Sequence, residues 1–299
     1  MTKARNLGYR AEILQKIGRM YPLYSGNFRL INSRALRLFT RDDPQDVWCE
    51  GPGGPMLVPL SDAVGKCIYY TGDYDRKITW LCRRLLKQGD TALDIGANLG
   101  VVALTMAKIV GPSGTIHAFE PNPNMQRLIE ASRARSGYAN PKLHKIALGA
   151  EKGELDLFIP PSNFGAASFV KRHHHFGTTR CAVETLSDVL NREGTTAIRL
   201  IKIDVEGFEN EVLRGAVSVI SRLRPDAIIM ETSDIAGCSF RDRPPIVTLL
   251  RFDYRLFAIP RALLSMRVEE IDINRTDAPS HDVLAVAEEK RDQVMSLLS

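Results

Sequence analysis

The sequence contains little that would indicate a disulfide framework, a zinc site or a membrane span. Its five cysteines are odd in number, widely spaced and form no Cys-x-x-Cys pair, which favours a reducing compartment. No apolar run reaches the ~18 residues that a transmembrane helix needs. The first twenty residues are basic but lack the continuous apolar stretch of a signal peptide. We therefore expect a cytoplasmic protein without a transmembrane segment, and contact with a membrane surface stays open.

A strong excess of charge of one sign is also missing. The 299 residues include 40 Lys and Arg against 35 Asp and Glu, which gives a net charge of +5. A nucleic-acid-binding surface would need basic residues clustered on one face, whereas the basic runs here are short, so no nucleic-acid partner is expected. Charged residues make up 25% and hydrophobic residues 44% of the chain, as in ordinary globular proteins. An oligomer is compatible with this composition.

The chain divides by pattern into an accessory region at 1–69 and a larger domain at 70–299. The first region is predicted to contain a helix near 9–20 and a Gly/Pro-rich turn at 50–55. From residue 90, short apolar strands alternate with amphipathic helices, which predicts a mainly parallel α/β sheet with helices on both faces. The last two strands are expected to form an antiparallel pair at one edge. Strands are expected at 92–95, 115–119, 142–148, 155–159, 179–183, 200–205, 226–230, 255–259 and 282–287, and helices at 75–88, 100–109, 123–135, 186–191, 208–221 and 244–252.

A glycine-containing loop follows the first strand of this pattern and opens a helix. It reads Asp94-Ile95-Gly96-Ala97-Asn98-Leu99-Gly100. Gly96 allows a sharp turn and a close approach by a ligand, because it has no Cβ. The carboxyl ends of parallel strands form the ligand crevice of such sheets, and helix N-terminal amides there can bind a carboxylate. Alone, the loop is weakly specific, since a tight turn without a ligand has the same pattern.

A carboxylate at the next strand end makes the pattern more specific. Glu120 lies twenty-four residues after Gly96, where it can accept hydrogen bonds from both ribose hydroxyls of a nucleoside. Pro121 and Asn122 suit the turn into the next helix. The loop lacks the middle glycine of a dinucleotide fingerprint, and Asp94 would repel a pyrophosphate but favour a cationic ligand. These features favour S-adenosylmethionine over NAD. An NAD-binding oxidoreductase and a non-catalytic nucleoside-binding module remain as alternatives.

At these residues the sequence resembles the FkbM family of methyltransferases, over roughly residues 69–287. The resemblance is carried by the segments GDTALDIGANLG, FEPN, ALG, TLSD and LIKIDVEGFE, at 89–100, 119–122, 147–149, 185–188 and 200–209. It implies a Rossmann-like class I methyltransferase fold with a mainly parallel seven-stranded sheet. It also implies methyl transfer from S-adenosylmethionine to an oxygen of a sugar or another small hydroxylated acceptor. The predicted cofactor-binding residues are Asp94, Gly96, Asn98, Gly100, Glu120, Pro121, Asn122 and Ala147.

The resemblance further implies that Asp204 and Glu206 face the transferred methyl group and the acceptor. In the sequence itself, Lys202, Asp204 and Glu206 alternate with apolar residues and so are expected on one face of a strand. Burying them is costly unless they are paired, so a structural ion pair with Lys202 is the alternative to a catalytic role. Glu231 follows another apolar strand and is the third candidate.

Methylation of an alcohol benefits from a general base within hydrogen-bond reach of the hydroxyl. Asp204, Glu206 and Glu231 are the predicted catalytic residues, with Asp234 and His281 as further candidates for the base. The same three acids can also bind Mg²⁺, which takes oxygen ligands, but the simple base is favoured. Two loops, at 70–74 and around the histidines at 173–175, are expected to close over the cofactor and the acceptor. Asp73 or Asp75 is expected to cap the helix that follows the first of these loops.

Overall fold

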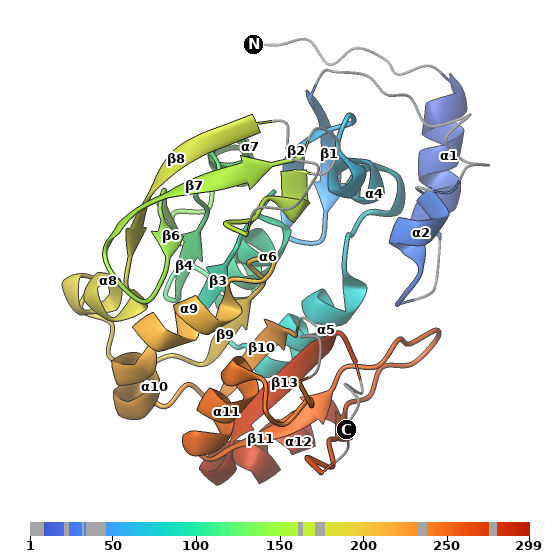
Figure 1. Ribbon diagram of the computed structural model, residues 1–299. Coiled ribbons are helices and arrows are strands. Elements are labelled where there is room, and N and C mark those ends of the chain that lie inside the picture. The colour runs from blue at the N-terminus through green and yellow to red at the C-terminus, as the bar shows by residue number, and fades with distance from the viewer. Residues whose placement is uncertain are drawn as a thin grey trace.

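The computed structural model describes residues 9–20, 24–31, 33, 46–160, 164–170, 177–232, 238–274 and 280–299. Its centre is an α/β sheet with the strand order β12-β11-β13-β10-β9-β3-β4-β5 (Figure 1). Strands β3, β4, β5, β9 and β10 run parallel, and β13 lies antiparallel between β10 and β11. The strands are β3 (Thr91–Ile95), β4 (Thr115–Phe119), β5 (Pro141–His144), β9 (Leu200–Ile203), β10 (Ala227–Glu231), β11 (Tyr254–Ala258), β12 (Glu269–Glu270) and β13 (Asp282–Ala287).

This sheet confirms the predicted class I methyltransferase fold. Seven strands match the expected sheet, and the two-residue strand β12 is added at its edge. The last two long strands, β11 and β13, are antiparallel neighbours as expected, but β13 is inserted inside the sheet and pairs with β10 as well. The strands that carry the predicted site, β3 and β9, are direct neighbours at the centre of the sheet. Their carboxyl ends therefore meet at one edge.

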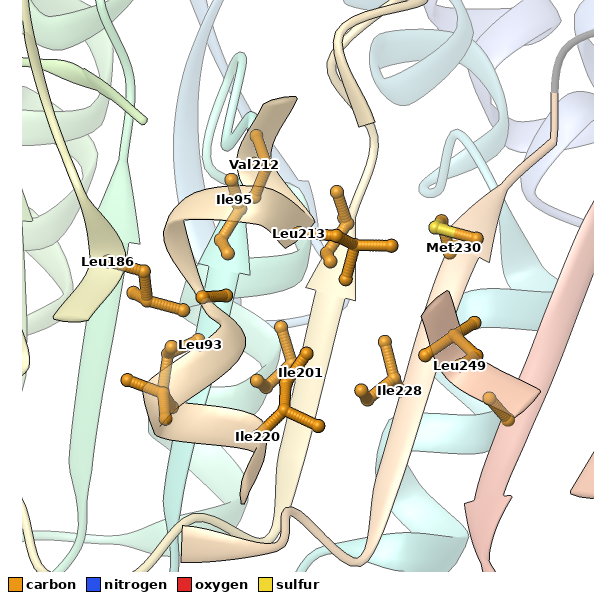
Figure 2. Close-up of a cluster of buried hydrophobic side chains, with 14 of the residues drawn as sticks. Leu93, Ile95, Leu186, Ile201, Val212, Leu213, Ile220, Ile228, Met230 and Leu249 are labelled. Atoms are coloured by element: carbon orange, nitrogen blue, oxygen red, sulfur yellow. The ribbon is translucent and has the colours of Figure 1, made fainter. Parts of the chain in front are cut away.

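Helices cover both faces because the strand residues are apolar on both sides. One face carries α8 (Leu186–Arg192), α9 (Glu209–Gly215), α10 (Val217–Leu223) and α11 (Pro244–Arg251). Figure 2 shows Leu93, Ile201 and Ile228 of three neighbouring strands packed against Leu213 and Ile220 of these helices. The other face carries α5 (Arg76–Leu85), α6 (Val101–Val110) and α12 (Arg291–Leu298). The two apolar layers hold the central strands rigidly beneath the site.

Some expected elements are divided in the structure. The strand expected at 142–148 is two strands in different sheets: β5 belongs to the main sheet, whereas β6 (Ala147–Leu148) joins β7 (Gly153–Ile159) and β8 (Gly177–Glu184) in a separate three-stranded sheet. The helix expected at 208–221 is interrupted at Ala216 between α9 and α10. At Gly215 the chain passes so near the carbonyl oxygen of Gly149 that a Cβ would lie 2.0 Å from it. Apolar periodicity alone does not reveal such contacts.

The N-terminal region packs against the sheet domain through its own apolar core. It consists of α1 (Tyr9–Arg19), α2 (Asn27–Ile31), a hairpin of β1 (Asp46–Gly51) and β2 (Gly54–Pro59), and α4 (Ala63–Thr71). Met56 and Val58 of the hairpin pack against Leu104 of α6 and Leu128 of α7 (Pro123–Ser136). Helix α4 runs across the expected boundary between residues 69 and 70, and the division into two domains stays a prediction.

Among the described helices, none combines the length and the apolarity that crossing a bilayer requires. The remaining short elements are two 3₁₀ helices, Phe164–Ala166 and Glu288–Lys290.

Candidate active site

Two loops touch each other at the carboxyl edge of β3 and β9. Gly96, directly after β3, has a φ of 78°, and a Cβ at this position would lie 1.9 Å from the carbonyl oxygen of Asp204. A side chain at Gly96 would therefore push the two loops apart, as well as requiring a strained backbone. Asn98 also has a positive φ, of 50°. Gly100 precedes the first residue of α6 in the same left-handed conformation. The predicted glycine turn is confirmed as a turn, with a close backbone contact as its cause.

Lys202 of β9 joins the two loops by charge. Its Nζ donates a 2.8 Å hydrogen bond to the carbonyl oxygen of Gly96, and lies 3.2 Å from Asp94 and 3.5 Å from Asp204. Burial opposes the charge of Lys202, but the carboxylates of Asp94 and Asp204 outweigh it and raise its pKa. Burial also raises the pKa of Asp94, which has no exposed surface, while Lys202 counters part of that rise. The ion pair considered from the sequence is thus present, and it involves both Asp94 and Asp204.

Glu120, at the end of β4, is fixed by backbone amides. Its Oε2 accepts a 2.7 Å hydrogen bond from the Asn98 N–H, and its Oε1 accepts a 2.8 Å bond from the Asn122 N–H. Burial raises the pKa of Glu120 to about 7, although both amides favour the charged form. Asn122 in turn caps α7 by accepting a hydrogen bond from the Asn124 N–H. The acid is therefore oriented before any ligand arrives, and each oxygen keeps acceptor capacity for a further donor.

Three carboxylates meet in the second half of the site. One oxygen each of Asp204, Glu206 and Glu231 lies within 4.8 Å of the others. Strand β9 ends at Ile203, so Asp204 and Glu206 lie in the turn after it and not on the strand face expected from the alternation. Glu206 has a φ of 53° and Gly207 a φ of 97°. A non-glycine residue in this region stores strain, and such residues cluster at functional sites.

The environment of Glu231, the last residue of β10, favours its protonated form. Burial, together with the charge of Asp204 and a hydrogen bond to it, raises the pKa of Glu231 to about 9. His281 Nδ1 lies 3.1 Å from Glu231 Oε1, with the imidazole largely exposed. At neutral pH Glu231 therefore holds a proton that it shares with Asp204. Of the three acids, it is the least suited to remove a further proton.

A cavity connects the glycine loop to the acid cluster. Its lining includes Gly96 and Asn98 from the first loop, together with Asp204, Glu206 and Glu231. The other predicted cofactor residues lie outside this lining: Asp94 is buried beneath it, Gly100 starts α6, Glu120, Pro121 and Asn122 lie at and after the end of β4, and Ala147 is buried in β6. Glu120 is linked to the cavity by its bond to Asn98. Asp234 and the histidines at 173–175 lie outside the described residues.

The cavity wall contains further residues. Tyr74 of the loop at 70–74, which was expected to close over the cofactor, lines it, as do Asp75, Asp282 and the further base candidate His281. Of these, Asp282 was not proposed as a site residue. Asp75 is the expected cap of α5, since its Oδ1 accepts hydrogen bonds from the Lys77 and Ile78 N–H groups. Asp282 accepts a 2.7 Å hydrogen bond from Lys77 Nζ. Asp282 is the first residue of β13, and an acidic residue at the end of a strand is the only sequence feature that could have indicated it.

A second cavity adjoins the first and shares Glu231 with it. Its lining includes Glu209, Asn210, Thr232 and the buried Arg243. The carboxylate of Glu209 accepts hydrogen bonds from the N–H groups of Val205 and Gly207, which holds the turn after β9 in place. Neither Arg243 nor Glu209 was predicted as a site residue, although Glu209 ends the segment 200–209 that carries the family resemblance.

Comparison with known proteins identifies the family. Residues 94–256, which include both loops and all three acids, match the model of the "Methyltransferase FkbM domain". The chain belongs to the FkbM methyltransferase family. This assignment decides against the NAD-dependent oxidoreductase, and S-adenosylmethionine is the methyl donor of this family.

Two curated relatives match parts of this FkbM-family chain. The 31-O-demethyl-FK506 methyltransferase FkbM of Streptomyces tacrolimicus is 28% identical over 185 residues, which cover 51% of this chain and 68% of that protein. The hexuronic acid methyltransferase AglP of Haloferax volcanii is 31% identical over 137 residues, 45% of this chain and 53% of that protein. A solved structure of methyltransferase FkbM from Methylobacillus flagellatus KT is 15% identical with a TM-score of 0.41, covering 67% of this chain and 44% of that one. Matches thus span about half to two thirds of the curated relatives.

Proposed function

We propose that this FkbM-family protein is an S-adenosylmethionine-dependent O-methyltransferase that acts on a hydroxyl of a sugar or another small hydroxylated acceptor. One observation carries the proposal: Asp204, Glu206 and Glu231 gather within 4.8 Å in the same cavity as the glycine loop. An acceptor hydroxyl needs a nearby proton acceptor and hydrogen-bond partners, and carboxylates supply both. The two curated relatives, whose names describe an FK506 and a hexuronic acid methyltransferase, are consistent with a hydroxylated acceptor.

The residues of the first loop fit the proposed cofactor. Asn98 Oδ1 is buried without a hydrogen-bond partner in the described part of the chain, so it is available to a ligand donor. The fixed carboxylate of Glu120 is proposed to accept hydrogen bonds from the ribose hydroxyls, with Asn122 holding it. Gly96 allows the glycine loop to pack against the Asp204 carbonyl, and Asp94 acts on the loop through Lys202. Gly100, Pro121 and Ala147, which lie outside the cavity lining, are proposed to support the loops around it.

The acid cluster is proposed to align the acceptor and take its proton. When bound, S-adenosylmethionine supplies a methyl group that its sulfonium already activates for displacement. The acceptor hydroxyl must lose its proton as the new carbon–oxygen bond forms. Because Glu231 holds a proton at neutral pH, we assign the base to Asp204, which lines the cavity 3.5 Å from Lys202 Nζ. Glu231 and Glu206 are proposed to hold the acceptor in place, and alignment of this kind supplies a large share of the rate.

The same three acids also have the chemistry of a divalent cation site. Carboxylate oxygens are the ligands that Mg²⁺ prefers, and three of them lie within 4.8 Å of one another. A cation there would neutralise the mutual repulsion of the acids and orient two neighbouring hydroxyls of the acceptor. The base assignment is favoured, because the raised pKa of Glu231 already relieves the repulsion through a shared proton. Turnover that EDTA abolishes and Mg²⁺ restores would reverse this preference.

Calorimetry with S-adenosylhomocysteine and with NAD tests the cofactor assignment. The wild type is expected to bind the first and not the second. Glu120→Ala is expected to weaken S-adenosylhomocysteine binding by about tenfold to a hundredfold, because the ribose hydroxyls lose the carboxyl group that is proposed to bind them. Glu154→Ala, an acid on the exposed surface of β7, serves as the matched control and is expected to bind as the wild type does. Unchanged affinity in Glu120→Ala would refute the ribose role.

Turnover tests the reaction and the base. The enzyme is expected to convert S-adenosylmethionine to S-adenosylhomocysteine with at least one member of a panel of sugars and hydroxylated compounds. Asp204→Asn is expected to lower kcat by about a hundredfold or more while leaving S-adenosylhomocysteine affinity nearly unchanged. Asp292→Asn, at a fully exposed aspartate of α12, controls for the same chemical change. Full activity in Asp204→Asn would remove this residue from catalysis. Cofactor binding with no turnover on any acceptor would favour the non-catalytic module.

A further inference from the structure

Helix α1 is attached to the domain by one face and exposes apolar residues on another. On the attached face, Gln15 Nε2 donates a 3.1 Å hydrogen bond to the carbonyl oxygen of Tyr69, and Gly18 lies so close to Tyr70 that a Cβ would be 2.4 Å from its carbonyl oxygen. Ile13, Ile17 and Met20 follow at helical spacing and are 39%, 62% and 80% exposed. Burial against α4 therefore leaves an apolar stripe of α1 facing solvent.

The loop after β11 adds two leucines beside this stripe. Leu263 and Leu264 are 63% and 75% exposed. The backbone N–H of Tyr24 donates a 3.0 Å hydrogen bond to the carbonyl oxygen of Leu263, which ties the loop to the segment between α1 and α2. Arg19, the last residue of α1, and Leu264 line one surface pocket. Figure 1 shows this orange loop reaching the lower end of the dark blue helices. We call Ile13, Ile17, Met20, Leu263 and Leu264 the apolar patch.

Exposed basic residues lie on the same segments of the chain as the apolar patch. Lys16 of α1, Arg29 of α2, and Arg261 and Arg267 of the loop are all exposed. Residues 1–30 contain six basic residues and one acidic residue, and residues 259–268 contain two basic residues and no acidic one. These two segments together carry a net charge of +7, whereas the whole chain carries +5, so the rest of the molecule is slightly acidic. The two segments that contain the apolar patch therefore carry a net positive charge larger than that of the whole chain. Among these exposed basic side chains, Arg267 lies 3.5 Å from the carboxylate of Glu269.

We propose that the apolar patch and the basic residues on the same segments dock this enzyme on an anionic lipid bilayer. Aliphatic side chains at the water–lipid boundary, with Lys and Arg among the headgroups, are the arrangement by which amphipathic helices bind such surfaces. A second copy of the chain fits less well, because a symmetric dimer through this face would bring two positive surfaces together. A nucleic acid would leave the five apolar side chains without an apolar environment.

Docking in this orientation would bring the cavity to the membrane. Asn27 Nδ2 of α2 donates a 2.9 Å hydrogen bond to the carbonyl oxygen of Asp73, and Phe28 packs edge-on against Tyr74 with ring centroids 5.7 Å apart. Tyr74 lines the cavity that contains the acid cluster. The acceptor hydroxyl would then belong to a molecule anchored in the bilayer. This consequence rests on the proposed function, whereas the docking itself does not.

Vesicle sedimentation of the full chain, without cofactor or acceptor, tests the docking. We expect binding to vesicles of phosphatidylcholine with phosphatidylglycerol, weaker binding at high salt, and little binding to phosphatidylcholine alone. The double variants Ile17→Ser/Met20→Ser and Leu263→Ser/Leu264→Ser are each expected to weaken binding by about tenfold or more. Lys16→Glu/Arg267→Glu is expected to weaken it to a similar extent, and only in the anionic vesicles. Calorimetry with S-adenosylhomocysteine, expected to be unchanged, verifies that each variant is folded.

The controls are exposed valines elsewhere on the surface. Val217→Ser and Val247→Ser replace side chains that are 43% and 48% exposed on α10 and α11, and they are expected to bind vesicles as the wild type does. Absence of binding to the anionic vesicles, or equal binding by the patch variants and the wild type, would overturn the proposal. Light scattering that shows a dimer lost in Leu263→Ser/Leu264→Ser would also overturn it and make the patch a contact between copies. Because no turnover is measured, a failed methyl-transfer assay leaves this result intact.

Discussion

The carboxylates in the two halves of the active site have opposite environments. In the glycine-loop half, Glu120 accepts two backbone hydrogen bonds and Asp94 is paired with Lys202. In the other half, Asp204, Glu206 and Glu231 face one another, and the pKa of Glu231 is raised by burial and by Asp204. The first half is thus fixed before a ligand binds. The second is electrostatically unfavourable without a proton or another positive charge, which suits a place where a cationic donor and a proton are handled.

Lys202 is the residue on which this contrast depends. It contacts Gly96 and Asp94 in the first half and Asp204 in the second. A single buried cation therefore holds the glycine loop in place and reduces the repulsion among the acids. Removing it affects both halves at once, whereas changes at Gly96 or Glu231 affect one half more than the other.

Lys202→Met is expected to have the largest effect on stability. It leaves the buried Asp94 without its cation, which costs about 3–5 kcal/mol in the free energy of unfolding. Urea denaturation measures this loss. Lys142→Met breaks an exposed pair with Glu193 and is expected to cost less than about 1 kcal/mol. Adding Asp94→Asn to Lys202→Met should restore part of the stability, because the uncompensated charge is then gone. Equal losses in Lys202→Met and Lys142→Met would show that Lys202 does not hold the two halves together.

Gly96→Ala is expected to have the second-largest effect. Backbone strain and the clash with the Asp204 carbonyl should lower the free energy of unfolding by about 3 kcal/mol, as measured by urea denaturation. S-adenosylhomocysteine affinity should fall with it, because the glycine loop must move. Gly137→Ala separates the two causes: Gly137 has a similar φ of 71° but nothing within 4 Å of an added Cβ. That control should lose only about 1 kcal/mol. If Gly96→Ala is as stable as Gly137→Ala, the contact between the two loops does not contribute to stability.

The sequence predicted the first half of the site better than the second. A glycine turn after a strand and an acid at the next strand end are local patterns, and both lie where they were expected. The apolar strands also predicted that helices cover both faces of the sheet, because the face on which a strand residue lies follows from its position in the sequence. The family resemblance supplied the methyl-donor chemistry, which the match over residues 94–256 supports.

What the sequence could not predict depends on contacts between distant segments. Strand β9 ends at Ile203 and the chain then turns through Glu206 and Gly207, so alternation misplaced Asp204 and Glu206. The presence of Asp282 in the cavity wall requires α5 and β13 to come together, as the bond from Lys77 to Asp282 shows. Neither spacing nor composition contains that information, because it arises only when the sheet is assembled.

Glu231→Gln is expected to have the smallest effect on stability. It is also the most direct test of whether the acid cluster differs electrostatically from the glycine-loop half of the site. In the unfolded chain a glutamate loses its proton near its ordinary pKa, but in the folded protein Glu231 keeps it until its pKa of about 9. The unfolded state therefore binds fewer protons over this interval, so wild-type stability falls as the pH rises from about 5 to about 9. Glu231→Gln lacks this penalty and should gain about 1–3 kcal/mol relative to the wild type across that window, as measured by urea denaturation at several pH values.

Glu193→Gln provides the control for this pH dependence. A hydrogen bond from Lys142 lowers the pKa of Glu193, so its carboxylate is charged in both states throughout the window. The stability difference between Glu193→Gln and the wild type should therefore stay flat. If the difference for Glu231→Gln is flat as well, Glu231 is ionised at neutral pH, as Glu193 is. The acid cluster would then hold three negative charges without a shared proton, a bound cation would have to balance them, and the assignment of Asp204 as the base would give way to the metal.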